Sequence, residues 1–454
     1  MSTAPPRPYG SYVYAYPHKT AYRELEDRPA LRELWADEPK NALSLYLHIP
    51  FCEVRCGFCN LFTRIGAPDE LTGRYLDALD RQATAVRDAL DAGPAGADDG
   101  GNGDSAVRFS AAAFGGGTPT FLDPGELERL CDIAEKRMGA DLGAVPLSVE
   151  ASPATATSDR LAVLAGRGTT RLSLGVQSFV ASEARAAVRP QRRADVEAAL
   201  AAVREAGIPV LNIDLIYGIE GQSARTWRAS LDAALAWRPE ELYLYPLYVR
   251  PLTGLGRLGT DADVAWDTQR LRLYRQGRDH LLAHGYEQVS MRMFRRADAP
   301  KQAADDYACQ TDGMIGLGCG ARSYTSSLHY SFDYAVDMRE VRKIIDDYTA
   351  TEDFSRAEVG RYVDAGEARR RHLLQSLLQA EGMPLAGYAD RFGTAPTDDF
   401  PAELDRFAAL GWLDESAPEG LLRLSPEGLA HSDALGPELF SPAVRAAMAA
   451  YDLK

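Results

Sequence analysis

The sequence predicts an α/β protein in which helices cover a parallel sheet, followed by a small, mostly helical domain. Short apolar segments typical of strands alternate with segments of helical periodicity between residues 43 and 249. Polar and glycine-rich residues follow the ends of these strands, where parallel sheets bind their ligands. After about residue 355 the pattern changes to three short helices and a hairpin. Together these observations favour the α/β class with a winged-helix-like C-terminal domain.

The six predicted strands lie at residues 43–49, 111–114, 147–151, 170–176, 210–218 and 241–249. Helices are predicted at residues 71–90, 124–138 and 194–206, because apolar residues recur there with helical spacing. Asp123 precedes Pro124 and is the expected N-cap of the second helix. Residues 92–105 are polar and of low complexity, which predicts a disordered surface insertion.

The expected domain organisation begins with an N-terminal arm at residues 1–40 and a main α/β domain at 41–330. A linker at 331–355 and an accessory domain at 356–454 follow. In the accessory domain, helices are predicted at 367–380, 384–392 and 401–410, and the two strands of a hairpin at 411–415 and 420–425. The arm is rich in tyrosine. Tyr14, Tyr16 and Tyr22 either pack on the main domain or line a substrate pocket, and both interpretations stay open.

Composition and charge exclude several classes of protein. A chain of 454 residues with 46% hydrophobic and 25% charged residues is an ordinary globular protein with room for two domains. Its formal net charge of −15 argues against broad binding to nucleic acid or to an anionic membrane. The basic run at residues 369–371 is expected to be a solvated helix face. No apolar run reaches the roughly 20 residues of a membrane span.

The N-terminus and the cysteines indicate the compartment. The first residues lack the charged-then-apolar order of a signal peptide. Of six cysteines, three are clustered and three are scattered, which is not the pattern of a secreted disulfide framework. A reducing cytoplasm is therefore the expected location.

The stretch at residues 46–62 contains Cys52, Cys56 and Cys59 in a C-x3-C-x2-C spacing, which brings three thiolates within reach of one metal centre. Three soft ligands select zinc, copper(I) or an iron–sulfur cluster. A structural zinc site needs a fourth ligand, and this loop supplies none in register. A [4Fe–4S] cluster held by three cysteines leaves one iron open, so the spacing favours a cluster, with a zinc-binding module as the alternative.

Further polar residues follow the other predicted strands: Gly115 to Thr118, Glu150, Gln177, Arg189 and Asp214. Glycine lets a backbone approach a ligand closely, and a carboxylate at a strand end needs a partner. An amide, a guanidinium and two carboxylates together suit a zwitterion that carries a ribose. A plain turn or a helix cap is the alternative for each residue taken singly. The chain has no P-loop and no G-x-S-x-G motif, so neither a phosphate cradle of that type nor a hydrolase is favoured.

Several motifs in order resemble the radical S-adenosylmethionine (SAM) superfamily and, within it, the HemN-like group. They are YLHIPFC and the cysteine loop, FGGGTPT (114–120), GVQSF (175–179) and NIDLIYGIEGQ (212–222). The group comprises oxygen-independent coproporphyrinogen III oxidases, the heme chaperone HemW, and HemN-like methyltransferases and cyclopropanases. The resemblance runs from residue 45 to about residue 324, with a looser similarity in the C-terminal domain. It implies a partial (β/α)6 barrel and a HemN-like accessory domain.

The resemblance also implies cofactors, partners and residue roles. Cys52, Cys56 and Cys59 are expected to bind a [4Fe–4S] cluster whose open iron is chelated by SAM. One SAM, and in some members a second, is expected to contact eight matched positions: Tyr46, Gly116, Gly117, Thr118, Glu150, Gln177, Arg189 and Asp214. An electron donor such as flavodoxin or ferredoxin would drive formation of a 5′-deoxyadenosyl radical, which abstracts hydrogen from a small-molecule substrate. No catalytic side chain is assigned.

Departures from the group bear on the reaction. HemN has a further cysteine two residues after the third ligand, where this chain has Leu61. Residues 304–318 lack the His-Asn and the Trp of the heme chaperones. Cys309 and Cys319 in this region are expected to be buried structural thiols. The leading hypothesis is therefore a HemN-like radical SAM enzyme with an unidentified organic substrate. The alternatives are a coproporphyrinogen III oxidase, a methyltransferase or cyclopropanase, and a non-enzymatic heme chaperone.

Overall fold

The computed structural model describes residues 6–13, 15–92, 107–257, 263–300 and 313–454. At its centre six parallel strands follow one another in chain order: β2 (Leu43–Ile49), β3 (Phe109–Gly116), β4 (Leu147–Ala151), β5 (Thr169–Gln177), β6 (Val210–Tyr217) and β7 (Glu241–Pro246). All six predicted strands and the α/β class are confirmed. Strand β3 is longer than expected at both ends. Strand β7 ends earlier than expected, at a proline, which has no N–H for a further ladder hydrogen bond.

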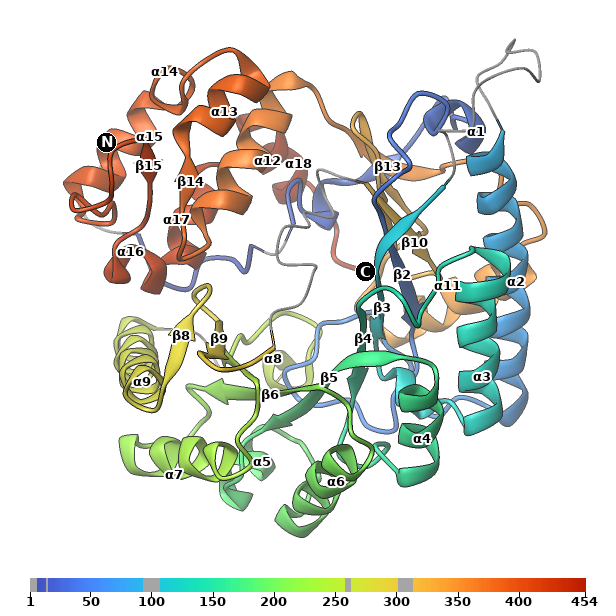
Figure 1. The fold of residues 1–454 in the computed structure, drawn as a ribbon, viewed down its shortest axis with the longest axis horizontal. Helices are drawn as coiled ribbons and strands as arrows, with labels where there is room; N and C mark the ends of the chain where they lie inside the picture. The colour runs from blue at the N-terminus through green and yellow to red at the C-terminus, as the bar shows by residue number, and fades with distance from the viewer. Residues whose placement is uncertain (1–5, 14, 93–106, 258–262, 301–312) are drawn as a thin grey trace.

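The sheet continues beyond both edges of this core. Next to β2 lie β10 (Met314–Leu317), which is parallel to it, and then the antiparallel strands β11 (Arg322–Tyr324), β12 (Leu328–Ser331), β13 (Val359–Tyr362) and β1 (Arg23–Glu24). Next to β7 lie β9 (Met293–Arg296) and β8 (Tyr286–Gln288). The result is one sheet of 13 strands, which Figure 1 shows curving through the centre of the molecule.

These outer strands change the expected domain boundaries. The expected linker at 331–355 contains helix α11 (Met338–Ala350), which packs against α2 (Asp69–Asp91). Strand β13 begins after the expected boundary at residue 356, yet it pairs with β12 in the large sheet. The expected linker is therefore part of the main α/β structure. The predicted insertion at 92–105 lies, apart from Ala92, outside the described residues.

The helices that follow the strands cover one face of the sheet. They are α2, α3 (Pro124–Asp132), α4 (Ser158–Gly166), α6 (Arg193–Glu205), α7 (Ala224–Leu235) and α9 (Val264–Ala283). Asp123 caps α3 as predicted, in a reciprocal capping box with Glu126. The predicted helix at 124–138 continues from α3 as a π-helical turn, η3 (Ile133–Arg137). Shorter elements of the main domain are α1 (Leu31–Leu34), η2 (Pro119–Phe121), α5 (Ala181–Ala186) and α8 (Gly254–Arg257).

Side chains alternate between the two faces of the central sheet. Leu45 and Leu47 of β2 are fully buried in the apolar core beneath the helices. The opposite face, here called the inner face, carries polar and aromatic residues such as Glu150, Asp214 and Tyr243, and the parallel register places Asp214 beside Tyr243. The sequence pattern therefore separates a structural face from a face that can bind ligands.

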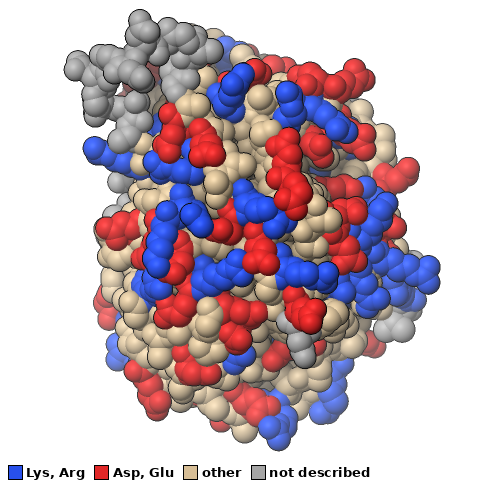
Figure 2. All heavy atoms as spheres, turned by 90° about the vertical axis from the view of Figure 1, so that its right-hand side faces the viewer, with Lys and Arg blue, Asp and Glu red and all other residues tan. Residues whose placement is uncertain are grey.

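The outer surface over α2 and α3 is charged with both signs. Figure 2 shows Lys and Arg interspersed with Asp and Glu on this side of the molecule. The ion pairs include Arg129 with Asp77 at 2.6 Å and Arg137 with Asp80 at 2.7 Å. Such exposed pairs contribute little stability, about 0–1 kcal/mol each. This face has no single-sign field of the kind that attracts nucleic acid.

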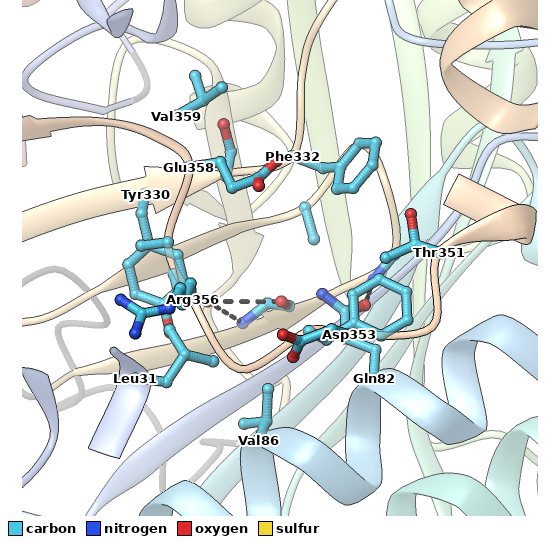
Figure 3. A pocket seen from close by; sticks show the side chains of 17 residues that line it. Leu31, Gln82, Val86, Tyr330, Phe332, Thr351, Asp353, Arg356, Glu358 and Val359 are labelled. Carbon is cyan, nitrogen blue, oxygen red and sulfur yellow. Dashed lines mark hydrogen bonds between the residues drawn. The ribbon is translucent and has the colours of Figure 1, made fainter. Parts of the chain in front are cut away.

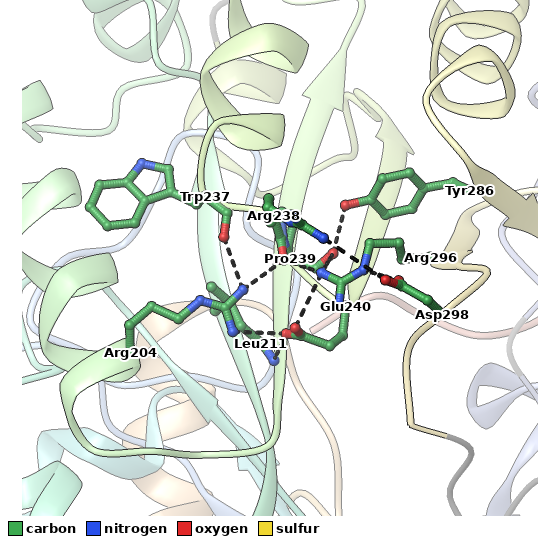
Figure 4. A network of polar contacts seen from close by, with 9 residues as sticks. All are labelled: Arg204, Leu211, Trp237, Arg238, Pro239, Glu240, Tyr286, Arg296 and Asp298. Atoms are coloured by element: carbon green, nitrogen blue, oxygen red, sulfur yellow. Dashed lines mark hydrogen bonds and ion pairs between the residues drawn. The ribbon is translucent and has the colours of Figure 1, made fainter.

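A polar network holds the end of the sheet opposite the cysteine loop (Figure 4). Glu240, just before β7, accepts hydrogen bonds from Arg204 Nη1 and from the backbone N–H of Leu211, both at 2.9 Å. Arg296 of β9 lies 3.3 Å from the other Glu240 oxygen and also pairs with Asp298. Because these groups satisfy one another, we assign the network a structural role.

The C-terminal domain has a separate apolar core. It contains α12 (Ala365–Leu377), α13 (Leu385–Phe392), α14 (Pro396–Asp399), α15 (Pro401–Ala409), α16 (Pro426–Ala430), α17 (Ser432–Glu438) and α18 (Pro442–Ala449). The predicted hairpin is present in reduced form: Leu413 and Leu424 make an isolated antiparallel bridge, flanked by backbone hydrogen bonds between residues 412–414 and 423–425. In addition, β15 (Leu421–Leu422) pairs with β14 (Met383–Pro384). Long-range packing, which local pattern does not report, selects this partner.

The basic run in α12 is also not the solvated face that the sequence predicts. Arg371 is 3% exposed and its Nη1 lies 2.8 Å from His329 Nε2. Arg370 donates to the carbonyl of Leu439 at 2.9 Å, and Arg369 lies 3.5 Å from Asp399. The three guanidinium groups therefore tie α12 to its neighbours.

The N-terminal arm packs on both domains, through η1 (Lys19–Ala21) and the residues around it. Tyr16 is 1% exposed in the C-terminal core, where its hydroxyl donates to Glu367 and its ring packs on Phe440. Tyr22 is buried as well, whereas Tyr14 lies outside the described residues. In the described part of the chain, no helix is both long and apolar enough to cross a membrane.

Candidate functional site

The cysteine loop follows the carboxyl end of β2 and is held by backbone hydrogen bonds. Cys52 N–H donates to Arg64 O at 3.0 Å. Gly57 donates to Ala187 O at 3.0 Å and accepts from Leu255 N–H at 2.7 Å. A Cβ atom on Gly57 would lie 2.8 Å from the side chain of Val188, so only glycine fits between these segments. The loop is therefore fixed by Arg64, which follows it closely in sequence, and by two distant parts of the chain.

Each of the three thiols has its own polar neighbour. Cys52 Sγ lies 3.5 Å from Thr118 Oγ1, Cys59 Sγ lies 4.0 Å from Thr63 Oγ1, and Arg189 Nη1 donates to Cys56 Sγ at 3.0 Å. Burial raises the pKa of Cys52 to about 12 and also raises that of Cys59. Cys59 and Cys56 add to the shift of the Cys52 pKa, and Cys56 adds to that of Cys59.

The arrangement of the thiols bears on the kind of metal centre that they could hold. No group of three His, Cys, Asp or Glu residues in the described ranges could hold one ion. In an iron–sulfur cluster each cysteine binds a different iron atom, which requires thiols that surround a larger group.

The glycine-rich turn after β3 clamps the start of the loop. Gly117 N–H donates to Ile49 O at 2.7 Å, and Thr118 N–H donates to Phe51 O at 2.8 Å. A Cβ atom on Gly117 would lie 2.6 Å from Phe51 O. Gly116 has φ +113° and packs against the ring of His48. Glycine is thus required at Gly116 and Gly117 partly because a side chain there would collide with other parts of the same chain.

Two carboxylates lie on the inner face beside this turn. Glu150 accepts from Gly116 N–H at 2.9 Å, and Asp214 accepts from Asn212 Nδ2 at 2.7 Å and Ser173 Oγ at 3.3 Å. Glu150 is solvent-accessible on this face, and the protein atoms around its carboxylate still desolvate it. Burial raises the pKa of Glu150 to about 7, with Asp214 adding to the shift, and burial also raises the pKa of Asp214. Such carboxylates favour a hydroxyl or ammonium partner.

The remaining predicted residues join these groups. Tyr46 Oη lies 3.2 Å from His48 Nδ1, and a Cβ atom on Gly115 would lie 3.1 Å from Tyr46 Oη. Gln177 has φ +70° and its amide lies against Gly175, whose carbonyl accepts from Arg189. The structure therefore places all of the predicted site residues around one end of the central strands.

A row of aromatic side chains on the inner face of β7 was not predicted from the sequence. Tyr243 and Tyr245 stack with ring centroids 5.8 Å apart, and Tyr12 of the arm packs edge-on against Tyr245 at 6.3 Å. The guanidinium of Arg292 lies 3.9 Å from the ring of Tyr12 and forms a 2.5 Å ion pair with Asp433 of α17. The alternation of tyrosines along β7 was a usable signal, but the approach of the arm was not visible in the sequence.

Lys19 was missed as well. Its Nζ lies 3.6 Å from the ring centroid of Tyr334, whose hydroxyl donates to Asn60 O of the cysteine loop at 2.9 Å. Burial lowers the pKa of Lys19 and the charge of Arg322 adds to the shift. The arm therefore reaches the far side of the loop.

The scattered cysteines lie apart from the loop. Cys131 and Cys319 are fully buried and free, as expected for Cys319, and Cys319 Sγ lies 3.9 Å from Tyr75 Oη. Cys309 lies outside the described residues. These observations support structural roles for the two described thiols.

A cavity of about 180 Å³ lies elsewhere, between α2, β10 to β12 and residues 351–359 (Figure 3). It is on the face of the sheet covered by α2. Gln82 at its wall accepts from Gly318 N–H and from Tyr348 Oη, both at 2.7 Å. None of the predicted site residues lines it. The cavity is therefore not the candidate site.

Comparison with known proteins gives the class. The family model "Radical SAM superfamily" matches residues 106–234, from just before β3 into α7. This segment of the chain is therefore similar to the radical SAM superfamily. The cysteine loop precedes the matched segment.

Similarity to individual proteins points to the HemN-like group. The chain is 28% identical over 346 residues to the oxygen-independent coproporphyrinogen III oxidase of Escherichia coli, covering 74% of this chain and 71% of that protein. It is 31% identical over 290 residues to the enzyme of the same name from Paracoccus denitrificans, covering 62% and 60%. It is 26% identical over 403 residues to the heme chaperone HemW of Bacillus subtilis, covering 87% and 98%.

The fold agrees. The structure of coproporphyrinogen III oxidase (HemN) from Escherichia coli matches with a TM-score of 0.77 and 22% identity, over 94% of this chain and 96% of that one. The predicted HemN-like radical SAM fold and the similarity to this group are confirmed.

Proposed function

We propose that this protein is a radical SAM enzyme in which Cys52, Cys56 and Cys59 hold a [4Fe–4S] cluster. The observation that supports this best is the arrangement of three free thiols on one rigid loop, each beside a polar group, next to the inner-face carboxylates. This donor set fits a cluster, because thiolates are its usual ligands.

The chain's own residues prepare this site. Thr118 and Arg189 donate toward Cys52 and Cys56, which stabilises sulfur in the thiolate form that binds metal. Glu150 and Asp214 offer carboxylate oxygens to the ammonium and ribose hydroxyls of SAM. When bound, the cluster and SAM supply reductive cleavage to a 5′-deoxyadenosyl radical that abstracts hydrogen from the substrate.

We further propose one SAM site built by Tyr46, Gly116, Gly117, Thr118, Glu150, Gln177, Arg189 and Asp214. A second SAM and the identity of the substrate follow from none of these contacts. Leu61 is 49% exposed and offers no thiol where HemN has its additional cysteine, so an organic substrate other than coproporphyrinogen III is favoured.

Anaerobic reconstitution with iron and sulfide tests the proposal. The protein is expected to bind about four iron and four acid-labile sulfide. With dithionite and SAM it is expected to release 5′-deoxyadenosine, and Cys56→Ala is expected to abolish this release. Cys131→Ala, which alters a buried thiol far from the loop, is the matched control and should keep it. Full cluster loading without 5′-deoxyadenosine in the wild type contradicts the proposal.

Three further measurements separate the alternatives. SAM with a deuterated methyl group puts label into the product only if the enzyme is a methyltransferase or cyclopropanase. Titration with heme changes the Soret band only if the protein binds heme as a chaperone. Loss of carbon dioxide from coproporphyrinogen III identifies the oxidase.

A further inference from the structure

Lys19 is a cation that reaches the cysteine loop from the N-terminal arm. Its Nζ lies 3.6 Å from the ring centroid of Tyr334. Tyr334 is anchored at two points, because its hydroxyl donates to Asn60 O at 2.9 Å and its carbonyl accepts from Tyr451 Oη at 3.0 Å. Asn60 directly follows Cys59. The ammonium is therefore held beside the end of the cysteine loop by an anchored aromatic ring.

No carboxylate of the described residues pairs with Lys19, and its Nζ has no hydrogen-bond acceptor among them. Asp333, which precedes Tyr334, accepts from Lys454 Nζ at 2.6 Å instead. Asp337, which follows Tyr334 by three residues, lies 3.5 Å from Arg257. A charge in a desolvated position is costly without a partner. The position of Lys19 therefore indicates a negative group that these carboxylates do not supply.

The charge of Lys19 acts on both ends of the cysteine loop. Burial and the charge of Arg322 lower the pKa of Lys19, whereas the charge of Cys59 raises it. Burial also lowers the pKa of His48, at the carboxyl end of β2 before the loop, to about 4, and the charges of Arg322 and Lys19 add to that shift. Because Coulomb interactions are mutual, Lys19 stabilises negative charge on the cysteines.

We propose that the Lys19 ammonium is the counter-charge of the centre held by Cys52, Cys56 and Cys59 and that it sets the reduction potential of this centre. The inference rests on the proposed function, because it needs a redox centre on these cysteines. Three thiolates give a [4Fe–4S] cluster a net negative charge, and reduction by one electron makes this charge larger. A nearby cation therefore stabilises the reduced form more than the oxidised form and raises the potential.

The place of Lys19 in the chain makes this counter-charge depend on the arm. Lys19 begins η1, which packs against α18 of the C-terminal domain. Arg23, just after η1, donates to the carbonyl of Ala447 in α18. The arm and the C-terminal domain together therefore determine the charge beside the cysteine loop.

Reduction potentials of the reconstituted protein test this role. The protein is titrated anaerobically with dithionite and redox mediators, the reduced cluster is measured by electron paramagnetic resonance, and iron and acid-labile sulfide are determined. Lys19→Met removes the charge and keeps a long apolar side chain, whereas Lys19→Arg keeps the charge. Lys40→Met is the matched control, because Lys40 is also half-buried but lies before the other end of β2, where its Nζ donates to Leu90 O at 3.0 Å.

Lys19→Met is expected to make one-electron reduction of the cluster about tenfold less favourable, which lowers the potential by about 59 mV. Lys19→Arg and Lys40→Met should keep the wild-type potential. The resonance signal comes only from loaded protein, so a lower iron content in a variant does not prevent the measurement.

A wild-type potential in Lys19→Met overturns the proposal. The same shift in Lys19→Arg also overturns it, because the cause is then structural, and so does the same shift in Lys40→Met, because the cause is then net charge alone. If wild-type protein carries no cluster after reconstitution, the proposed function fails, and the role of Lys19 fails with it.

Discussion

Replacing Gly117 by alanine tests how the loop is built. Gly117 and Thr118 hold the chain just before Cys52 through hydrogen bonds to Ile49 and Phe51. The added methyl group would lie 2.6 Å from Phe51 O and 2.9 Å from both Ile49 O and Phe51 N. All three contacts are with backbone atoms, which cannot rotate away as a side chain can. Gly117→Ala must therefore displace either the turn or the start of the cysteine loop.

Two estimates of the stability lost in Gly117→Ala agree. Forcing a methyl group into a tightly packed site costs about 1–3 kcal/mol. If the turn moves instead, the two hydrogen bonds at 2.7 and 2.8 Å are lost. Each is worth about 0.5–1.5 kcal/mol, so their loss costs about 1–3 kcal/mol as well. We therefore expect a lower Tm for the metal-free protein and incomplete iron loading after reconstitution.

Scanning fluorimetry of the metal-free protein and iron analysis after reconstitution measure these two effects. Gly166→Ala is the control, because its methyl group meets no atom within 4 Å and alanine favours the end of helix α4. Gly166→Ala should keep or raise the Tm and load iron fully. A Gly117→Ala protein with wild-type Tm and wild-type iron content would show that Gly117 does not hold the start of the cysteine loop.

Three further predictions concern other contacts. Burial raises the pKa of Glu150 to about 7, so the folded protein binds the proton of this carboxyl group more tightly than the unfolded chain, and the stability of the fold falls as pH rises from about 4.5 to about 7. Glu150→Gln should flatten this dependence of Tm on pH in thermal denaturation, and an unchanged dependence contradicts the pKa shift. Arg189 donates to Cys56 and belongs to the proposed SAM site. Arg189→Met should therefore weaken SAM binding roughly tenfold or more in anaerobic calorimetry. Arg292→Met leaves the buried carboxylate of Asp433 without its cation and should cost about 3–5 kcal/mol, seen as a lower Tm and faster proteolysis of the C-terminal domain.

Much of the central fold was predictable because it depends on local pattern. The six strands of the central sheet repeat apolar residues at strand spacing, and Asp123 caps its helix through a contact of three residues. The cysteine spacing and the polar residues at the strand ends were also visible. Since parallel strands end at one edge of a sheet, residues as distant in sequence as Cys56 and Arg189 were expected near each other. In the structure, Arg189 Nη1 lies 3.0 Å from Cys56 Sγ.

Pairings between distant segments were not predictable in this way. Strands β10 to β13 extend the sheet past the expected linker, and β15 pairs with the distant strand β14. These choices depend on which surfaces remain to be buried once the core has formed, and short strands carry little pattern of their own. The same reason explains why Arg371 is buried and why Arg369 and Arg370 are half-buried and not fully solvated.

By itself, the sequence determined the class of the protein: a parallel α/β sheet, three cysteines on the loop after its first strand, and polar residues at its strand ends. Tertiary structure decided how the site is enclosed. It brought Tyr12 and Lys19 of the arm to opposite sides of the site and made the glycines clamp the loop. The physical reason is that periodicity and spacing are local properties, whereas enclosure and exposure depend on the packing of the whole chain.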